Sequence, residues 1–307
     1  MIELGWMRPE APYMPIAAAG LLSALADAGE QATLTWSGRG LVRQLQLDTR
    51  FTPGEVAQAV LDAPWPDLDR IPWAGKRGQA LRPMLAEHED PAAELRRLRA
   101  AVDHECGPGE QRLLRSLVCE GSIDGKGVPA RSRLLRGVKA DLSGLTDNVK
   151  LKPTSLAHEL LSGPVWENGS TGRALGFAPE VQTFGGTTGL DPSSTGSHSP
   201  LLYRLLWLGI LILPPVAVTN RGGRTVGGPL VTGTEGNDVT LSWPVWSFPA
   251  DLATLKTLYS LPQVHFGGLE GPPRAWARDR DIAAIYRVTS TPINTMIGAF
   301  RWARRVL

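Results

Sequence analysis

Residues 205–218 read LLWLGILILPPVAV and form the most apolar stretch of the chain. Apolar side chains would cover every side of a helix built from this stretch, which predicts a helix over 201–213 that is buried all round. Pro214 and Pro215 end that helix, because proline lacks an amide hydrogen and clashes with the preceding turn. A membrane-spanning helix needs about 20 apolar residues, so this shorter stretch predicts the centre of a folded core.

The sequence before this stretch begins with a predicted helix, a β-hairpin and a second helix. Residues 15–29 are rich in alanine and leucine, and Gly29 is a suitable C-terminal stop. Residues 31–37 (QATLTWS) and 41–48 (LVRQLQLD) have the alternation and composition of two strands. Thr52 is followed by a proline and then by a glutamate three positions on, which is the capping-box pattern of a helix start.

The rest of the chain predicts a helical middle and a β-rich section. Helices are expected over 79–89, 91–105, 110–120 and 251–259, strands over 216–220, 225–232, 239–244 and 281–290, and a closing basic helix over 294–306. The fold class is therefore α+β, with the β-rich section near 216–245 followed by closing helices. We expect an N-terminal α+β domain over 1–162, flexible Gly/Ser-rich loops over 163–200, and a C-terminal α+β domain over 201–307.

Composition is that of an ordinary globular protein. The 307 residues are 42% hydrophobic and 20% charged, which is sufficient for a sizeable core. Cys106 and Cys119 are the two cysteines, too few for a disulfide scaffold or a multi-cysteine zinc site. The first residues, MIELGWMRPE, lack the apolar core of a signal peptide. We therefore expect a cytoplasmic protein without a membrane segment.

Charge is segregated along the chain, although the formal net charge is only +2. Residues 1–69 and 153–273 carry net charges of −5 and −3, whereas 70–152 and 274–307 carry +5 each. Concentrated lysine and arginine are typical of proteins that bind phosphate backbones. The candidate nucleic-acid-binding residues are Lys126, Arg131, Arg133, Arg136, Lys139, Lys150, Lys152, Arg221, Arg224, Arg301, Arg304 and Arg305. The competing interpretation is that such cations form a solvated surface or pair with acidic neighbours.

Sequence motifs for catalysis are weak. Residues 121–127 (GSIDGKG) resemble a phosphate loop, but one residue is missing between the glycines and Gly127 stands where Ser or Thr should bind magnesium. The five histidines are scattered and complete no metal-ligand pattern. We therefore expect no cofactor, no metal and no enzyme activity. The strongest catalytic alternative is a hydrolytic site in the loop containing Asp191, Ser193, Ser194, Ser197 and His198.

Ten tryptophans are many for a chain of this length. Trp243 and Trp246 lie in the stretch SWPVW. Indole rings can stack on unpaired bases, but they more commonly anchor a core or a loop.

Two sets of segments resemble a known family. PIAAAGLLSAL (15–25) and TLTW (33–36) resemble the opening of large-subunit proteins from type I CRISPR effector (Cascade) complexes. LWLGILILPP (206–215), a hairpin rich in glycine and arginine, LSWPVW (241–246) and LATLKTL (252–258) then follow in an order typical of such proteins. The similarity is closest to the large-subunit and accessory-subunit group of type I-G (formerly I-U).

The resemblance implies a non-enzymatic subunit of an antiviral defence ribonucleoprotein. Such subunits contact the 5′ handle of the guide RNA and help to inspect the short duplex motif beside the target. The implied partners are guide RNA, target double-stranded DNA and other CRISPR effector subunits. Two other hypotheses stay open: a small hydrolase or nuclease that uses the Asp191–His198 loop, and a structural subunit whose basic tail docks on an acidic protein.

Overall fold

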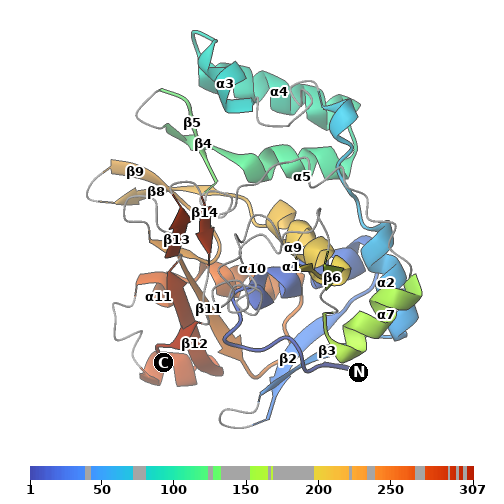
Figure 1. Ribbon diagram of the computed structural model, residues 1–307. Helices are drawn as coiled ribbons and strands as arrows, with labels where there is room; N and C mark the ends of the chain where they lie inside the picture. Colours follow the sequence, from blue (N-terminus) through green and yellow to red (C-terminus); the bar gives the residue numbers. More distant parts are fainter. Residues whose placement is uncertain are drawn as a thin grey trace.

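The computed structural model describes residues 1–38, 43–71, 81–123, 127–132, 153–164, 167–168, 197–220, 223–233, 239–266, 274–289, 291–294, 297–299 and 303–307. Helices and antiparallel sheets pack around a continuous hydrophobic core (Figure 1), which confirms the predicted α+β class. The expected division of the chain into domains stays a prediction.

Runs of helices and runs of short antiparallel strands follow one another along the chain. The helices are α1 (Met14–Asp27), α2 (Pro53–Asp62), α3 (Leu81–Ala86), α4 (Pro91–Glu105), α5 (Pro108–Leu117), α7 (Pro153–Ser162), α9 (Pro200–Ile212), α10 (Leu252–Ser260), α11 (Pro262–Phe266) and α12 (Arg274–Arg278), with a 3-10 turn η1 (Leu68–Arg70). The strands are β1 (Ile2–Leu4), β2 (Thr33–Ser37), β3 (Gln44–Asp48), β4 (Val118–Ile123), β5 (Pro129–Arg131), β6 (Glu167–Asn168), β7 (Ser197–His198), β8 (Val216–Asn220), β9 (Gly223–Gly227), β10 (Val231–Gly233), β11 (Thr240–Trp246), β12 (Ile282–Thr289), β13 (Thr291–Asn294), β14 (Ile297–Ala299) and β15 (Arg304–Arg305).

Helices α1 and α9 cross at the centre of the core (Figure 1). Both are buried nearly all round, so the predicted buried helix over 201–213 is confirmed. They cross at two glycines: a Cβ on Gly20 would lie 2.0 Å from the carbonyl oxygen of Leu205, and a Cβ on Gly209 would lie 2.0 Å from that of Ile16. Backbone therefore packs directly against backbone, which leaves room for no side chain at either position.

The N-terminal elements follow the sequence prediction closely. The predicted hairpin forms as β2 and β3, and β1 adds to the other side of β3, which the sequence did not predict. At the start of α2, the Glu55 amide donates to the Thr52 hydroxyl at 3.3 Å, while the Thr52 amide donates to the Glu55 carboxylate at 2.7 Å. This reciprocal capping box satisfies two amides that the helix itself leaves without partners.

The buried carboxylate of Glu30 ties the loop after α1 to the end of β3. Thr49 donates its hydroxyl to Glu30 at 3.0 Å, and the Arg50 amide donates at 2.8 Å. The Arg50 guanidinium adds contacts of 3.1 and 2.8 Å to the second carboxylate oxygen. These hydrogen bonds, chiefly those from Arg50, lower the pKa of Glu30 to about 2.

Acid should destabilise the protein partly through Glu30. A carboxylate whose pKa is depressed in the folded state stabilises the fold fully above its unfolded pKa and loses that contribution as pH falls through the folded value. For Glu30 this window runs from 4.5 down to about 2. We expect Glu30→Gln to have a lower free energy of unfolding than wild type at neutral pH. As pH falls through this range, its free energy of unfolding should decrease less than that of wild type. Urea titrations at a series of pH values measure both. Equal pH dependence of the two proteins would contradict this role.

The C-terminal sheet runs in the order β10-β11-β12-β15 and connects to the N-terminal half. A β-bridge joins Leu34 of β2 to Ala250, just after β11. The buried indole of Trp246 donates to the Leu34 carbonyl at 2.9 Å, and that of Trp243 donates to the Pro9 carbonyl at the same distance. The tryptophans of SWPVW are therefore core anchors and offer no surface for stacking a base.

Three element predictions are wrong in part or in full. The expected strand over 225–232 is divided into β9 and β10, with residues 228–230 between them. The expected helix over 110–120 ends at Leu117, where the chain turns into strand β4. The expected closing helix over 294–306 is also absent, because the described residues there form β14 and β15. β15 pairs with the edge of β12, and the hydrogen bonds available at that edge outweigh a weak local helix preference. In the described part of the chain, no helix is long and apolar enough to cross a membrane.

Candidate nucleic-acid interface

Strand β15 places two arginines at the edge of the C-terminal sheet. Arg304 lies directly opposite Arg287 of β12, and Arg305 lies opposite Tyr286. Residues directly opposite each other in antiparallel strands project from the same face, and like charges in such a pair repel. The fold therefore holds Arg287 and Arg304 together at an electrostatic cost, which an anion bound between them would remove.

Arg287 is fixed in place by its neighbours. Its Nε donates to the Ser242 hydroxyl at 2.7 Å, and its Nη2 donates to the main-chain oxygens of Val264 at 3.3 Å and His265 at 3.5 Å. Partial burial lowers the pKa of Arg287, and the positive charge of Arg304 lowers it further. Arginine stays protonated despite these shifts. The site therefore contains one cation held by hydrogen bonds, Arg287, opposite a more exposed one, Arg304.

Further cations gather around Tyr286. Burial and Glu10 raise the pKa of Tyr286, while Arg305 and Arg43 lower it, so both arginines lie within electrostatic range of this hydroxyl. The Arg305 Nη2 also donates to the Ala283 carbonyl at 3.1 Å, and its Nε donates to the main-chain oxygen of Leu307.

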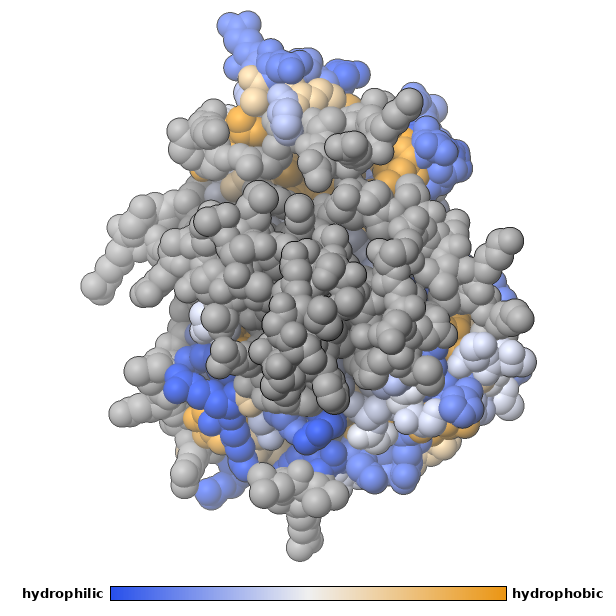
Figure 2. Space-filling model, viewed as in Figure 1, coloured by the Kyte–Doolittle hydropathy of each residue, from blue (hydrophilic) through white to orange (hydrophobic). Residues whose placement is uncertain are grey.

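The N-terminal segment lies beside the same strand. The Ala303 amide donates to the Glu10 carbonyl at 2.8 Å, and the Glu10 carboxylate pairs with Arg8 at 2.8 Å. We name this group of five arginines the cationic edge: Arg8, Arg43, Arg287, Arg304 and Arg305. Hydrophilic residues gather at the lower left of Figure 2, where Figure 1 places β12 and the end of the chain.

No known protein-family model matches the chain, and no curated protein matches it significantly in sequence. The geometry and the resemblance of its segments therefore carry the functional proposal.

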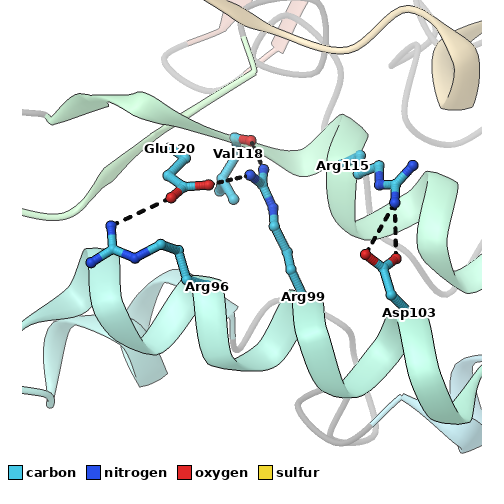
Figure 3. Close-up of polar contacts among 6 residues, drawn as sticks. All are labelled: Arg96, Arg99, Asp103, Arg115, Val118 and Glu120. Atoms are coloured by element: carbon cyan, nitrogen blue, oxygen red, sulfur yellow. Dashed lines mark hydrogen bonds and ion pairs between the residues drawn. The ribbon is translucent and has the colours of Figure 1, made fainter.

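The arginines of the α4–α5 lobe pair with carboxylates, as Arg8 does with Glu10. Arg96 and Arg99 of α4 both contact Glu120 of β4, at 3.4 and 2.6 Å, and Arg115 of α5 contacts Asp103 at 2.9 Å (Figure 3). Two further arginines of these helices form the ion pairs Arg97–Glu94 and Arg112–Asp27. Carboxylates thus neutralise this part of the basic zone over 70–152, as the competing interpretation of charge runs expects.

The structure places four of the twelve candidate binding residues. Arg304 and Arg305 are exposed and adjacent in β15. Arg131 pairs with Val118 in the β4–β5 hairpin, and Arg224 pairs with Thr219 in the β8–β9 hairpin. These two hairpins are neighbours, since β4 contacts both β8 and β9 (Figure 1). The others lie outside the described residues: Lys126, Arg133, Arg136, Lys139, Lys150, Lys152, Arg221 and Arg301.

Three arginines of the cationic edge were not predicted from the sequence. Arg8 and Arg43 lie in the acidic segment over 1–69, and Arg287 lies in a strand that shows no basic run. Arg287 is the one charged residue in a mostly apolar strand. This isolated charge was the one feature of the sequence that could have indicated a functional role for it. Only strand pairing reveals that it faces Arg304.

The predicted catalytic loop is described only at its end. Ser197 and His198 pair with Asn168 and Glu167 in the β6–β7 ladder, whereas Asp191, Ser193 and Ser194 lie outside the described residues. Among the residues that the structure describes, no three histidine, cysteine or acidic side chains are grouped to hold a metal ion.

The buried Ser199 next to this loop has a structural role. Its hydroxyl donates to the buried Glu159 carboxylate at 2.5 Å and accepts from the Leu202 amide at 3.2 Å. The second contact is the N-cap of α9, and N-caps stabilise the first turn of a helix. This serine therefore fixes the start of the central helix.

Proposed function

We propose that this chain is a non-enzymatic, nucleic-acid-binding subunit of a type I CRISPR RNA-guided effector complex. It contacts the guide RNA, the target DNA near its adjacent motif, or both. The arrangement that carries the proposal is Arg304 directly opposite the fixed Arg287, with Arg305 at the next position of the same edge strand, on the face of Tyr286. The resemblance of the α1, β2, α9, β11 and α10 sequences to subunits of such complexes supports the same assignment.

A phosphate is the ligand that suits this arrangement. Arginine presents a planar set of donors that matches phosphate oxygens and keeps its charge when partly buried. A phosphate placed between Arg287 and Arg304 turns their mutual repulsion into attraction. A polyanion such as RNA or DNA would also be attracted by Arg305 and Arg43, which lie close to Tyr286.

Replacing Arg304 and Arg305 together by alanine should weaken nucleic-acid binding and reduce its salt dependence. For every phosphate that the variant no longer binds, the slope of log affinity against log salt should fall by about 0.7–0.9. Fluorescence anisotropy with labelled RNA and DNA, over a series of KCl concentrations, measures both quantities. Thermal stability should stay close to that of wild type, because both side chains are exposed.

The matched control is Arg96→Ala with Arg97→Ala. This pair removes the same charge from exposed side chains, but both arginines already contact carboxylates. We expect the control to bind nearly as wild type does. Equal loss of affinity in the two double variants would show a general charge effect and refute the assigned surface.

The hypothesis of docking on an acidic protein predicts a different result. An effector subunit held through RNA should be released from its complex by ribonuclease, whereas a subunit held by an acidic partner should stay bound. Co-purification of the tagged chain with its neighbours, before and after nuclease treatment, separates the two. If the chain stays bound to its neighbours after nuclease treatment, and the Arg304/Arg305 variant does not bind them, the contact is with an acidic protein. That result would refute the present proposal.

A further inference from the structure

A cation and an aromatic ring are stacked on each other at the start of β12. Trp276 lies in α12, and its ring packs partly against the hydrophobic core. The guanidinium carbon of Arg280 lies 5.1 Å from the centroid of that ring. The Arg280 Nη1 also donates to the Trp276 carbonyl at 3.2 Å. The ring and this hydrogen bond together hold an exposed guanidinium in one orientation.

This stacked pair is close to the cationic edge. Arg305 reaches along β12 to the Ala283 carbonyl, and Ala283 follows Arg280 by three residues, across the turn between α12 and β12 in which Asp281 has a φ of 51°. α12 packs against β12, and the end of the chain lies beside the same strand (Figure 1). The neighbouring charged side chains are Arg278, Asp279 and Asp281, all exposed.

We propose that Trp276 and Arg280 form a stacking platform for one unpaired base, so that the nucleic acid on the cationic edge is single-stranded. The proposal rests on the proposed function and specifies its substrate. Unpaired bases stack on aromatic rings and on guanidinium planes. The bases of a duplex are already stacked on one another and cannot reach such a platform without being unpaired.

The division of roles follows from the geometry. Arg304 and Arg305 contact phosphates and make binding sensitive to salt, without regard to the base. Arg280 offers the flat face of its guanidinium, whose stacking depends on a base but only weakly on salt. A site with both kinds of contact would distinguish a single strand, whose base faces are open to stacking, from a duplex, whose bases are already stacked on one another.

The test compares Arg280→Lys with Arg278→Lys in the full chain. Lysine keeps the charge but lacks the planar group, so Arg280→Lys should bind a short single strand about tenfold more weakly. Its affinity for two other probes, a duplex of the same sequence and a single strand with abasic sites, should equal that of wild type. Arg278→Lys should leave all three affinities unchanged. RNA and DNA versions of each probe show whether the strand is guide RNA or unwound DNA.

Trp276→Leu should reproduce the effect of Arg280→Lys, with a thermal melt to confirm that the protein is folded. An Arg280→Lys variant that binds the single strand as wild type does, or that loses affinity equally for all probes, would refute the platform while leaving the proposed function intact. Failure of wild type to bind any probe at low salt would instead refute the proposed function, and the platform with it.

Discussion

Gly209→Ala should destabilise the protein by about 3 kcal/mol or more, as overpacking of a rigid core does at its upper end. The added methyl group would lie 2.0 Å from the carbonyl oxygen of Ile16, which is backbone and cannot rotate away. α1 would have to move away from α9, and both helices are buried on nearly all sides. Gly20→Ala should behave in the same way, because its Cβ would meet the Leu205 carbonyl at 2.0 Å.

The control for this prediction is Gly54→Ala. Gly54 is exposed near the start of α2, and the nearest atom to an added Cβ lies 4.0 Å away. Alanine favours a helix more than glycine does, so this variant should be as stable as wild type or slightly more stable. Urea unfolding followed by circular dichroism measures all three variants. Gly209→Ala within about 1 kcal/mol of wild type would show that the helices can separate at low cost.

Arg204→Met should have the second large effect, about 3 kcal/mol, because it leaves buried carbonyl groups without donors. Arg204 of α9 is 9% exposed. Its Nε donates to the Val60 carbonyl at 2.6 Å, and its Nη2 donates to the Leu61 carbonyl at 2.5 Å. Its guanidinium also lies 4.5 Å from the ring centroid of Trp65. Arg204 thereby satisfies the open C-terminal carbonyls of α2 from a distant helix.

Arg204 remains charged despite its burial, which lowers its pKa only to about 10. Arg204→Lys should therefore keep a positive charge but lose the planar set of donors. Its free energy of unfolding should lie between those of Arg204→Met and wild type. Arg96→Met, in an exposed ion pair of α4, is the comparison and should change stability by about 0.5 kcal/mol or less. Equal unfolding free energies for Arg204→Met and Arg96→Met would show that Arg204 does not hold α2 in place.

Prediction from the sequence succeeded where the signal is local. The buried helix α9, the capping box at Thr52 and the β2–β3 hairpin each depend on residues a few positions apart, so a short window contains the whole cause. It failed over 294–306, where Arg304 and Arg305 form a strand that pairs with β12 instead of a helix. The edge of a distant strand decided that conformation, and no window around the segment includes it.

The candidate site shows the same division. Local charge density marked Arg304 and Arg305 as cations, because a basic cluster is visible in the sequence itself. Their pairing with the fixed Arg287 and their closeness to Arg43 depend on strand register and on the packing of the two halves of the chain. The amino-acid sequence alone thus determined the central helix α9, the capping box of α2, the β2–β3 hairpin and the basic tail, since these arise from neighbours along the chain. Only the tertiary structure decided which helix faces meet at Gly20 and Gly209, and which arginines meet carboxylates or one another, because those contacts join residues that only packing brings together.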